Sequence, residues 1–237
     1  QIVEAERLGF DSVWITEHHF CDDGYTPSPL VMAAAIGART RRMRLGTNLM
    51  ILPLHNPVRI AEDAATLSLL TGERINFEGK RFKVGDLRIT PVPEHPPKIF
   101  LGGMVEPAID RAARIADGFL STGGIGQDVY LECLKRHGKS PEEGVIIAGH
   151  WAIISDDPER EAEVVGPHVL YQSNQYIEWG AFGPPESTPR FPDARTALEQ
   201  GLYELWDGET AVVRLVDLLR RYPQIKDLHL WAQFPGE

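Results

Sequence analysis

Short apolar runs alternate along the chain with longer amphipathic runs, a pattern typical of strand–helix units around a parallel sheet. The clearest helix is predicted over 209–221, because its apolar side chains recur every three or four positions. A second helix is predicted over 29–40, with Ser28 as N-cap and Pro29 as its first residue. Further helices are predicted over 58–70 and 106–116, and strands over 12–16, 45–52, 98–101, 118–121, 145–154 and 227–234.

These units predict an α/β fold, a TIM-type (β/α)8 barrel that lacks two of its members. Eight units need about 250 residues, and the chain has 237. The gaps are expected at the first strand, before Gln1, and at the fourth-strand region near Gly72, where the helix ending at Leu70 runs almost at once into 75–77. Either the protein is genuinely shortened or residues are absent from the sequence. We favour the second, because an open parallel barrel would expose unpaired strand edges.

We expect a single domain over 1–237 with a lid-like insertion at about 163–206. A connection of this length inside a compact domain is usually functional or disordered, and its aromatic content favours packing onto something. The segment is therefore a candidate lid. Its aromatic residues and prolines are Tyr171, Tyr176, Trp179, Phe182, Pro184, Pro185, Pro189 and Pro192.

Charge and composition narrow the classes of function. The 24 basic side chains face 34 acidic ones, giving a net charge of -10, which argues against a nucleic-acid partner. No apolar run reaches the roughly 18–20 residues that cross a bilayer, and the start carries no signal pattern. Cys21 and Cys133 stand far apart without metal-ligand spacing, which indicates neither a disulfide framework nor structural zinc. We therefore expect a cytoplasmic protein with no membrane partner.

The first candidate site follows directly on the predicted strand 12–16. In βα barrels the strand ends carry the active site, so Glu17, His18 and His19 are expected to face a ligand. His18 is the predicted catalytic residue, because a histidine exchanges protons near neutral pH; one of the two adjacent histidines is expected to be a packing residue. A metal site would need a third ligand at short spacing, and none is present locally.

Two more candidates follow later strands. Gly102 and Gly103 end a predicted strand before a helix, so their bare backbone N–H groups suit a phosphate; an ordinary tight turn is the alternative. Thr47 and Asn48 could offer hydrogen bonds at a barrel mouth, or they could be satisfied polar groups of a buried strand. His55 is interpreted as a loop histidine.

Eight motifs occur together in one order: AERLGFDSVW at 5–14, EHHF at 17–20, PSPL at 27–30, RLGT at 44–47, PVRIAED at 57–63, FEGK at 77–80, PPKIFLGG at 96–103 and RAARIADG at 111–118. In this order they resemble the bacterial luciferase-like monooxygenase family. The similarity is strong over most of 1–125 and looser afterwards, through 163–206 and 228–231. Several ordered motifs are far more specific than any one of them.

The resemblance implies a βα barrel that binds reduced FMN, or the deazaflavin F420 in some branches, at the carboxyl ends of the strands. His18 matches the family's active-site histidine, and Asn48–Leu49 matches a non-proline cis peptide beneath the ring. The missing fourth-strand region ordinarily contributes cofactor contacts. The cofactor-binding residues are then expected to be Glu17, Thr47, Asn48, Leu49, Gly102, Gly103 and Met104.

The main hypothesis is a flavin-dependent oxidoreductase, a monooxygenase that uses reduced FMN and oxygen on a small organic substrate. Its partners would be that substrate, a flavin reductase and a second copy in a homodimer. One alternative is F420-dependent hydride transfer on the same fold, and another is a flavin-binding protein without turnover. A metal-dependent hydrolase, resting on His18 and His19 alone, is the last alternative.

Overall fold

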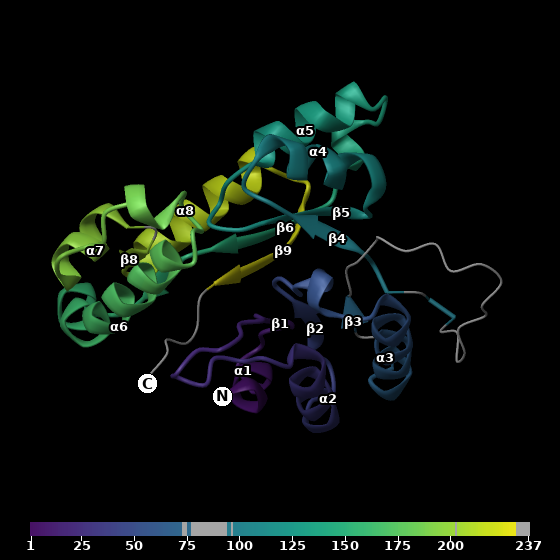
Figure 1. Ribbon diagram of the computed structural model, residues 1–237, viewed down its shortest axis with the longest axis horizontal. Helices are drawn as coiled ribbons and strands as arrows, with labels where there is room; N and C mark the ends of the chain where they lie inside the picture. Colours follow the sequence, from purple (N-terminus) through teal and green to yellow (C-terminus); the bar gives the residue numbers. More distant parts are fainter. Residues whose placement is uncertain (73–74, 77–93, 96, 202, 231–237) are drawn as a thin grey trace. The chain divides into compact units, whose positions relative to one another are not determined.

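Strands and helices alternate through the computed structural model, which describes residues 1–72, 75–76, 94–95, 97–201 and 203–230 (Figure 1). The chain divides into a first unit, Gln1–Ala148 with Gln224–His229, and a second unit, Gly149–Pro223 with Leu230. The single domain with a lid therefore stays a prediction. The motif at 77–80, Pro96 and Trp231 lie outside the described residues.

The first unit holds two parallel sheets and the helices that pack on them. The order is β1-β2-β3 in one sheet and β4-β5-β6-β9 in the other, and every pairing in this unit with a defined register is parallel. Figure 1 shows α4 and α5 together on one side of β4 and β5. The strands are β1 (Ser12–Ile15), β2 (Arg44–Thr47), β3 (Ile75–Asn76), β4 (Phe100–Gly102), β5 (Gly118–Ser121), β6 (Ile146–His150) and β9 (Ile225–Leu230), and the helices α1 (Ile2–Arg7), α2 (Pro29–Arg39), η1 (Leu52–Leu54), α3 (Pro57–Leu70), α4 (Glu106–Ile115), α5 (Gln127–Arg136) and η2 (Pro141–Glu143).

Side chains join β1 to β9. Ser12 Oγ donates to Asp227 Oδ1 at 2.9 Å, and the Trp14 ring stacks on the His229 ring with centroids 5.5 Å apart. Both pairs are two residues apart in each strand and follow the same order, so β1 and β9 run in the same direction. The carboxyl ends of the two strands therefore lie together, as they do in a βα barrel.

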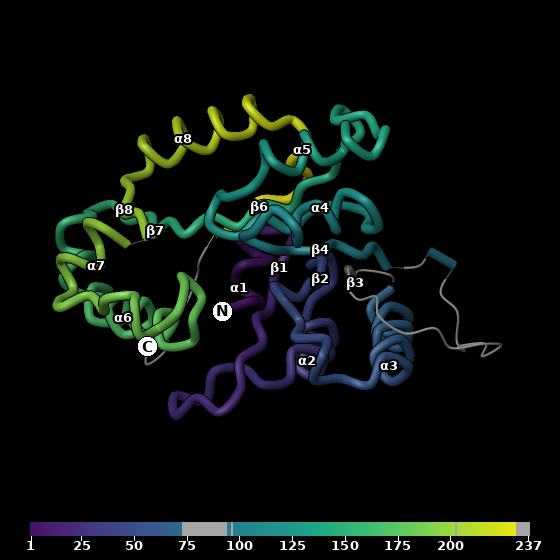
Figure 2. The backbone as a smooth tube through the Cα atoms, turned by 45° about the horizontal axis from the view of Figure 1, so that its top comes forward, coloured from purple at the N-terminus to yellow at the C-terminus, as the bar shows by residue number. Residues whose placement is uncertain are grey.

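The second unit has its own core. Its elements are α6 (Pro158–Glu178), α7 (Ala194–Gln200), α8 (Gly208–Arg221), the turn η3 (Pro185–Ser187) and the parallel pair β7 (Ala152–Ile154) and β8 (Glu204–Trp206). Figure 2 shows α6 and α7 side by side. Tyr176 and Phe182 pack against a cluster that includes Trp151, Val169 and Tyr203. The aromatic residues of 163–206 thus pack within this unit.

Local signals explain where most helices begin. Asn56 caps α3 by accepting from the N–H groups of Val58 and Arg59, and aspartates cap α6, α7 and α8 in the same way. Ser28 does stand at the N-cap of α2, but its side chain makes no capping hydrogen bond. The start of α2 is instead marked by Pro29, whose fixed φ suits the first helical turn.

Two predicted strands end early. The run 45–52 is a strand only to Thr47, and the chain then passes through a cis Asn48–Leu49 peptide to η1. The run 145–154 divides at Trp151, which packs into the core of the second unit. Neither α5 nor β8 is among the predicted elements.

Among the described residues no helix has both the length and the apolar character that crossing a membrane requires.

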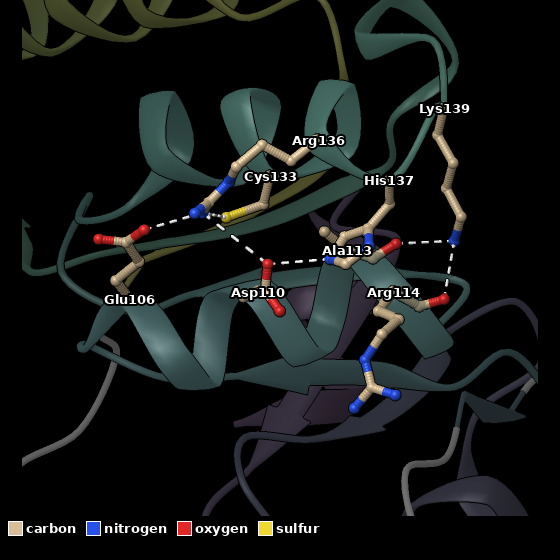
Figure 3. Close-up of polar contacts among 8 residues, drawn as sticks. All are labelled: Glu106, Asp110, Ala113, Arg114, Cys133, Arg136, His137 and Lys139. Carbon is tan, nitrogen blue, oxygen red and sulfur yellow. Dashed lines mark hydrogen bonds and ion pairs between the residues drawn. The ribbon is translucent and has the colours of Figure 1, made fainter.

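Polar contacts hold α4 against α5 and the turn that follows it (Figure 3). The positive charge of Lys139 at the last carbonyls of α4 complements the negative end of that helix. Because α4 starts just after Gly102 and Gly103, these contacts fix the helix side of the glycine turn. They run from Arg136 to Glu106 (2.8 Å), from His137 to Asp110 (2.9 Å), and from Lys139 to the carbonyls of Ala113 (2.7 Å) and Arg114 (3.1 Å), while Arg136 also donates to Cys133 Sγ (2.7 Å) within α5.

Candidate functional site

Glu17 connects the loop after β1 to the loop after β2. Its side chain is fully buried, and its Oε1 accepts hydrogen bonds from His19 Nε2 at 2.8 Å and His55 Nε2 at 2.6 Å. Its Oε2 accepts from the backbone N–H of Ile51 at 2.6 Å. Burial raises the pKa of this carboxyl, but the hydrogen bonds outweigh it and leave the pKa below its ordinary value of 4.5. The group is therefore a carboxylate at neutral pH.

Both oxygens of Glu17 are thus used by the protein itself, which suits a residue that positions its neighbours. The prediction that Glu17 contacts a cofactor directly stays a prediction. His55 does lie in a loop, but it is also a partner of Glu17. The sequence held one signal for this pairing, since His55 and Glu17 each follow a predicted strand.

His18 lies in the loop after β1 with its ring packed on Tyr25. The ring centroids are 4.1 Å apart and the planes differ by 7°, while the His18 backbone N–H donates to the carbonyl of Thr26 at 3.0 Å. Burial lowers the pKa of His18 to about 4, although the nearby carboxylates of Asp23 and Glu17 oppose this shift. The ring is therefore neutral at pH 7 and is a weaker base than an ordinary histidine.

Asn48 and Leu49 follow β2, and the peptide bond between them is cis, as the resemblance implies. The Asn48 backbone N–H donates to Ile15 at 2.8 Å, and its side-chain Nδ2 lies 2.9 Å from His229 Nε2. Thr47 is buried and pairs with Ile15 in the β1–β2 ladder. His229, which was not among the predicted site residues, therefore belongs to this neighbourhood.

Gly102 approaches Leu49 closely. A Cβ at Gly102 would lie 2.8 Å from Leu49 Cδ2 and 3.2 Å from the carbonyl oxygen of Leu120, so a side chain there would push the Leu49 side chain aside. A Cβ at Gly103 would lie 2.4 Å from the Cβ of Ala108 in α4. The Leu49 side chain, in the loop after β2, therefore packs against Gly102 at the end of β4.

The start of α4 lies a little beyond the two glycines. Met104 is 43% exposed, and Val105, the N-cap residue, makes no side-chain capping hydrogen bond. Glu106 adds a negative charge to the first turn, which opposes a phosphate there, but its carboxylate is paired with Arg136 at 2.8 Å. Pro107 in this first turn has no N–H group. The N–H groups of Ala108 and Ile109 donate to the Val105 carbonyl at 3.0 and 3.2 Å, so few donors of this turn remain for a phosphate.

The structure brings most of the predicted residues together within the first unit. Contacts join Glu17 to the loop after β2, Asn48 to β9 and Leu49 to Gly102. His18 is held by the loop after β1, and Met104 stands exposed beside the glycines. In the described part of the chain, no three or more His, Cys, Asp or Glu side chains are arranged to hold a metal ion.

The two low histidine pKa values predict an acid-labile fold. His18 and His229 both have a pKa of about 4 against an ordinary 6.5, with burial as the main cause. As the pH falls, these rings are protonated in the unfolded chain before they are protonated in the folded one. Their contribution to the free energy of unfolding is therefore fully present above pH 6.5 and is lost as the pH drops toward 4. Urea midpoints measured over this range should fall with pH, and less steeply in a His18→Gln variant. A flat or rising midpoint would contradict both assignments.

Comparison with known proteins supplies a family likeness. The model of the luciferase-like monooxygenase family matches residues 1–75 and 67–214. The F420-dependent glucose-6-phosphate dehydrogenase of Kineococcus radiotolerans is 30% identical over 56% of this chain and 54% of its own length. The alkanal monooxygenase alpha chain of Photorhabdus laumondii subsp. laumondii is 38% identical over 31% of this chain and 20% of its own.

A solved structure is similar in fold. The oxygenating constituent of 3,6-diketocamphane monooxygenase from Pseudomonas putida, in complex with FMN, superposes with a TM-score of 0.69 at 16% identity, covering 98% of this chain and 84% of that one. The chain spans about half the length of the F420-dependent curated relatives it matches, 54% in the case of the Kineococcus enzyme.

Proposed function

The chain belongs to the luciferase-like monooxygenase family, and from this premise we propose that it is a flavin-dependent oxidoreductase. The reaction proposed is a monooxygenation in which reduced FMN and oxygen act on a small organic substrate. His18 is the proposed catalytic residue. The proposed cofactor contacts are Glu17, through the loops that it holds, and Thr47, Asn48, Leu49, Gly102, Gly103 and Met104.

One observation carries the proposal: the Leu49 side chain lies against Gly102, so that the ends of β2 and β4 share one neighbourhood. Carboxyl ends of parallel strands are where βα folds place their ligands. The two glycines let this packing form, because Leu49 and Ala108 occupy the positions that a Cβ at Gly102 or Gly103 would take. The start of α4 has no side-chain cap, and the positive end of its helix dipole would suit a phosphate. The residues present thus fit a flavin-type cofactor.

The protein's part in the reaction is to bind, to orient and to move protons. When bound, reduced FMN would supply the electrons that reduce oxygen, so that one oxygen atom enters the substrate and the other leaves as water. Leu49 and Gly102 would contact one edge of the cofactor. The Glu17 carboxylate would hold the loop after β1 and the loop after β2 in place. The neutral ring of His18 would accept a proton from the substrate side at its unprotonated nitrogen and return it later.

A second candidate is hydride transfer with F420 and without oxygen. It is favoured by the likeness to the F420-dependent glucose-6-phosphate dehydrogenase, which covers 56% of this chain. The same residues would serve it, because both cofactors are planar rings with a phosphate-bearing tail. The two reactions differ in their need for oxygen.

A visible absorption spectrum tests the proposal directly. The purified chain is incubated with FMN or with F420, passed through gel filtration and scanned for the absorbance that stays with the protein. We expect one of the two cofactors to be retained. Retention of neither would overturn the proposed function. Oxygen uptake with reduced FMN and substrate then identifies the monooxygenase, and retention without turnover on any substrate class would identify a flavin-binding protein.

The proposed partners follow from the reaction. A flavin reductase would supply reduced FMN, a cytoplasmic location would give access to it, and a second copy of the chain would form a homodimer. The same gel filtration reports the dimer, since its elution volume distinguishes one copy from two.

A further inference from the structure

Asn48 and His229 meet inside the first unit although 181 positions separate them in the chain. The His229 ring stacks on Trp14, with an angle of 26° between the planes. Gly46 makes room for that indole, because a Cβ there would lie 2.4 Å from its Cε3 atom. The imidazole ring of His229 in β9 is thus held by Trp14 of β1 and by Asn48, which follows β2.

The protonation of this ring follows from its surroundings. Burial alone lowers the pKa of His229 to about 4, so the imidazole is neutral at pH 7 and has one N–H and one bare nitrogen. Asn48 Nδ2 is a donor, so Nε2 is the bare nitrogen and the proton lies on Nδ1. Nδ1 is buried and has no hydrogen-bond partner within the described ranges. The Nδ1–H of this tautomer is therefore buried without an acceptor among the described residues, which costs free energy. The alternative is the reversed amide, in which Nε2–H donates to Asn48 Oδ1.

We propose that His229 is a positioning residue for Asn48. By accepting the Nδ2–H, the imidazole fixes the carboxamide in the one orientation that turns its oxygen away from the ring. Asn48 then offers a hydrogen-bond acceptor to a ligand bound beside it, and the matching ligand carries an N–H or O–H at that place. A donor in the position of Nε2 would turn the amide over and reverse this preference. Only the identity of the ligand rests on the proposed function.

The first test needs no ligand. In the full chain labelled with nitrogen-15, we expect a scalar coupling across the hydrogen bond between Asn48 Nδ2 and His229 Nε2. The His229 nitrogen shifts should show Nδ1 protonated and Nε2 bare. A protonated Nε2, or assigned resonances without the coupling, would overturn the proposal.

The second test measures binding of FMN or F420, whichever the wild-type chain retains. His229→Phe keeps an aromatic ring on Trp14 and removes the acceptor, so the dissociation constant should rise about tenfold, the effect of one lost hydrogen bond. His229→Gln restores a carbonyl acceptor and should recover most of the affinity.

A matched control is His150→Phe at the end of β6, since the His150 ring also packs on a tryptophan, Trp206, with ring centroids 5.0 Å apart. It should leave the dissociation constant unchanged. Equal weakening by both phenylalanine variants, or no weakening by His229→Phe, would contradict the proposal. If the wild-type chain retains neither cofactor, the proposed function fails by itself, and the nitrogen coupling alone decides the role of His229.

Discussion

Replacing His18 with alanine is expected to slow turnover by about 10²–10⁴-fold, the range for loss of a positioned general acid or base. Burial keeps this ring neutral at pH 7, and its stacking on Tyr25 holds it in one place at the end of β1. The dissociation constant of the cofactor should hardly change, because the proposed contacts with the cofactor come from other residues. Steady-state turnover and a cofactor titration on the same preparation measure the two effects.

Two controls separate catalysis from folding in this experiment. His137→Ala removes a partly exposed histidine that pairs with Asp110 on α4 and α5, and it should leave turnover unchanged. Imidazole added to the His18→Ala variant should restore part of the rate if only the proton-transferring group is lost. Full turnover in His18→Ala would remove His18 from the mechanism.

Replacing Glu17 with leucine is expected to lower the free energy of unfolding by about 3 kcal/mol, since hydrogen bonds to a charged group contribute about 1.5–3 kcal/mol each and the partners are left unmatched. His19, His55 and the Ile51 N–H all lose their acceptor in this variant. The loop that carries Asn48 and Leu49 would then be released from the loop that carries His18. Urea unfolding measures the loss.

Glu17→Gln is the informative companion, because it keeps the size of the side chain and removes the charge. We expect stability between those of the wild type and the leucine variant, with turnover already reduced. Glu4→Leu is the control, since Glu4 forms only an exposed pair with Arg7 and should change stability little. A Glu17→Leu variant as stable as Glu4→Leu would show that the carboxylate does not hold the two loops.

Much of the first unit could be predicted from the sequence. The helices α2, α3 and α4 and the strands β1 and β5 lie within a residue or two of their predicted ranges, because their periodicity and their proline or polar starts are local signals. The later strands were harder, since β8 has three residues and no period can be seen in so short a run. The predicted strand 145–154 is interrupted at Trp151 because the Trp151 ring packs in the core of the second unit, which the local sequence does not reveal.

The site shows the same division. The sequence by itself determined that Glu17, His18, Asn48, Gly102 and Gly103 follow strands of an α/β fold, and the ordered motifs determined the family. Only the tertiary structure decided that Glu17 joins two loops, that His229 reaches Asn48, and that His18 is neutral. The physical reason is that strand order and helix periodicity are encoded in neighbouring residues, whereas burial, and the pKa that it shifts, depends on residues brought from distant parts of the chain.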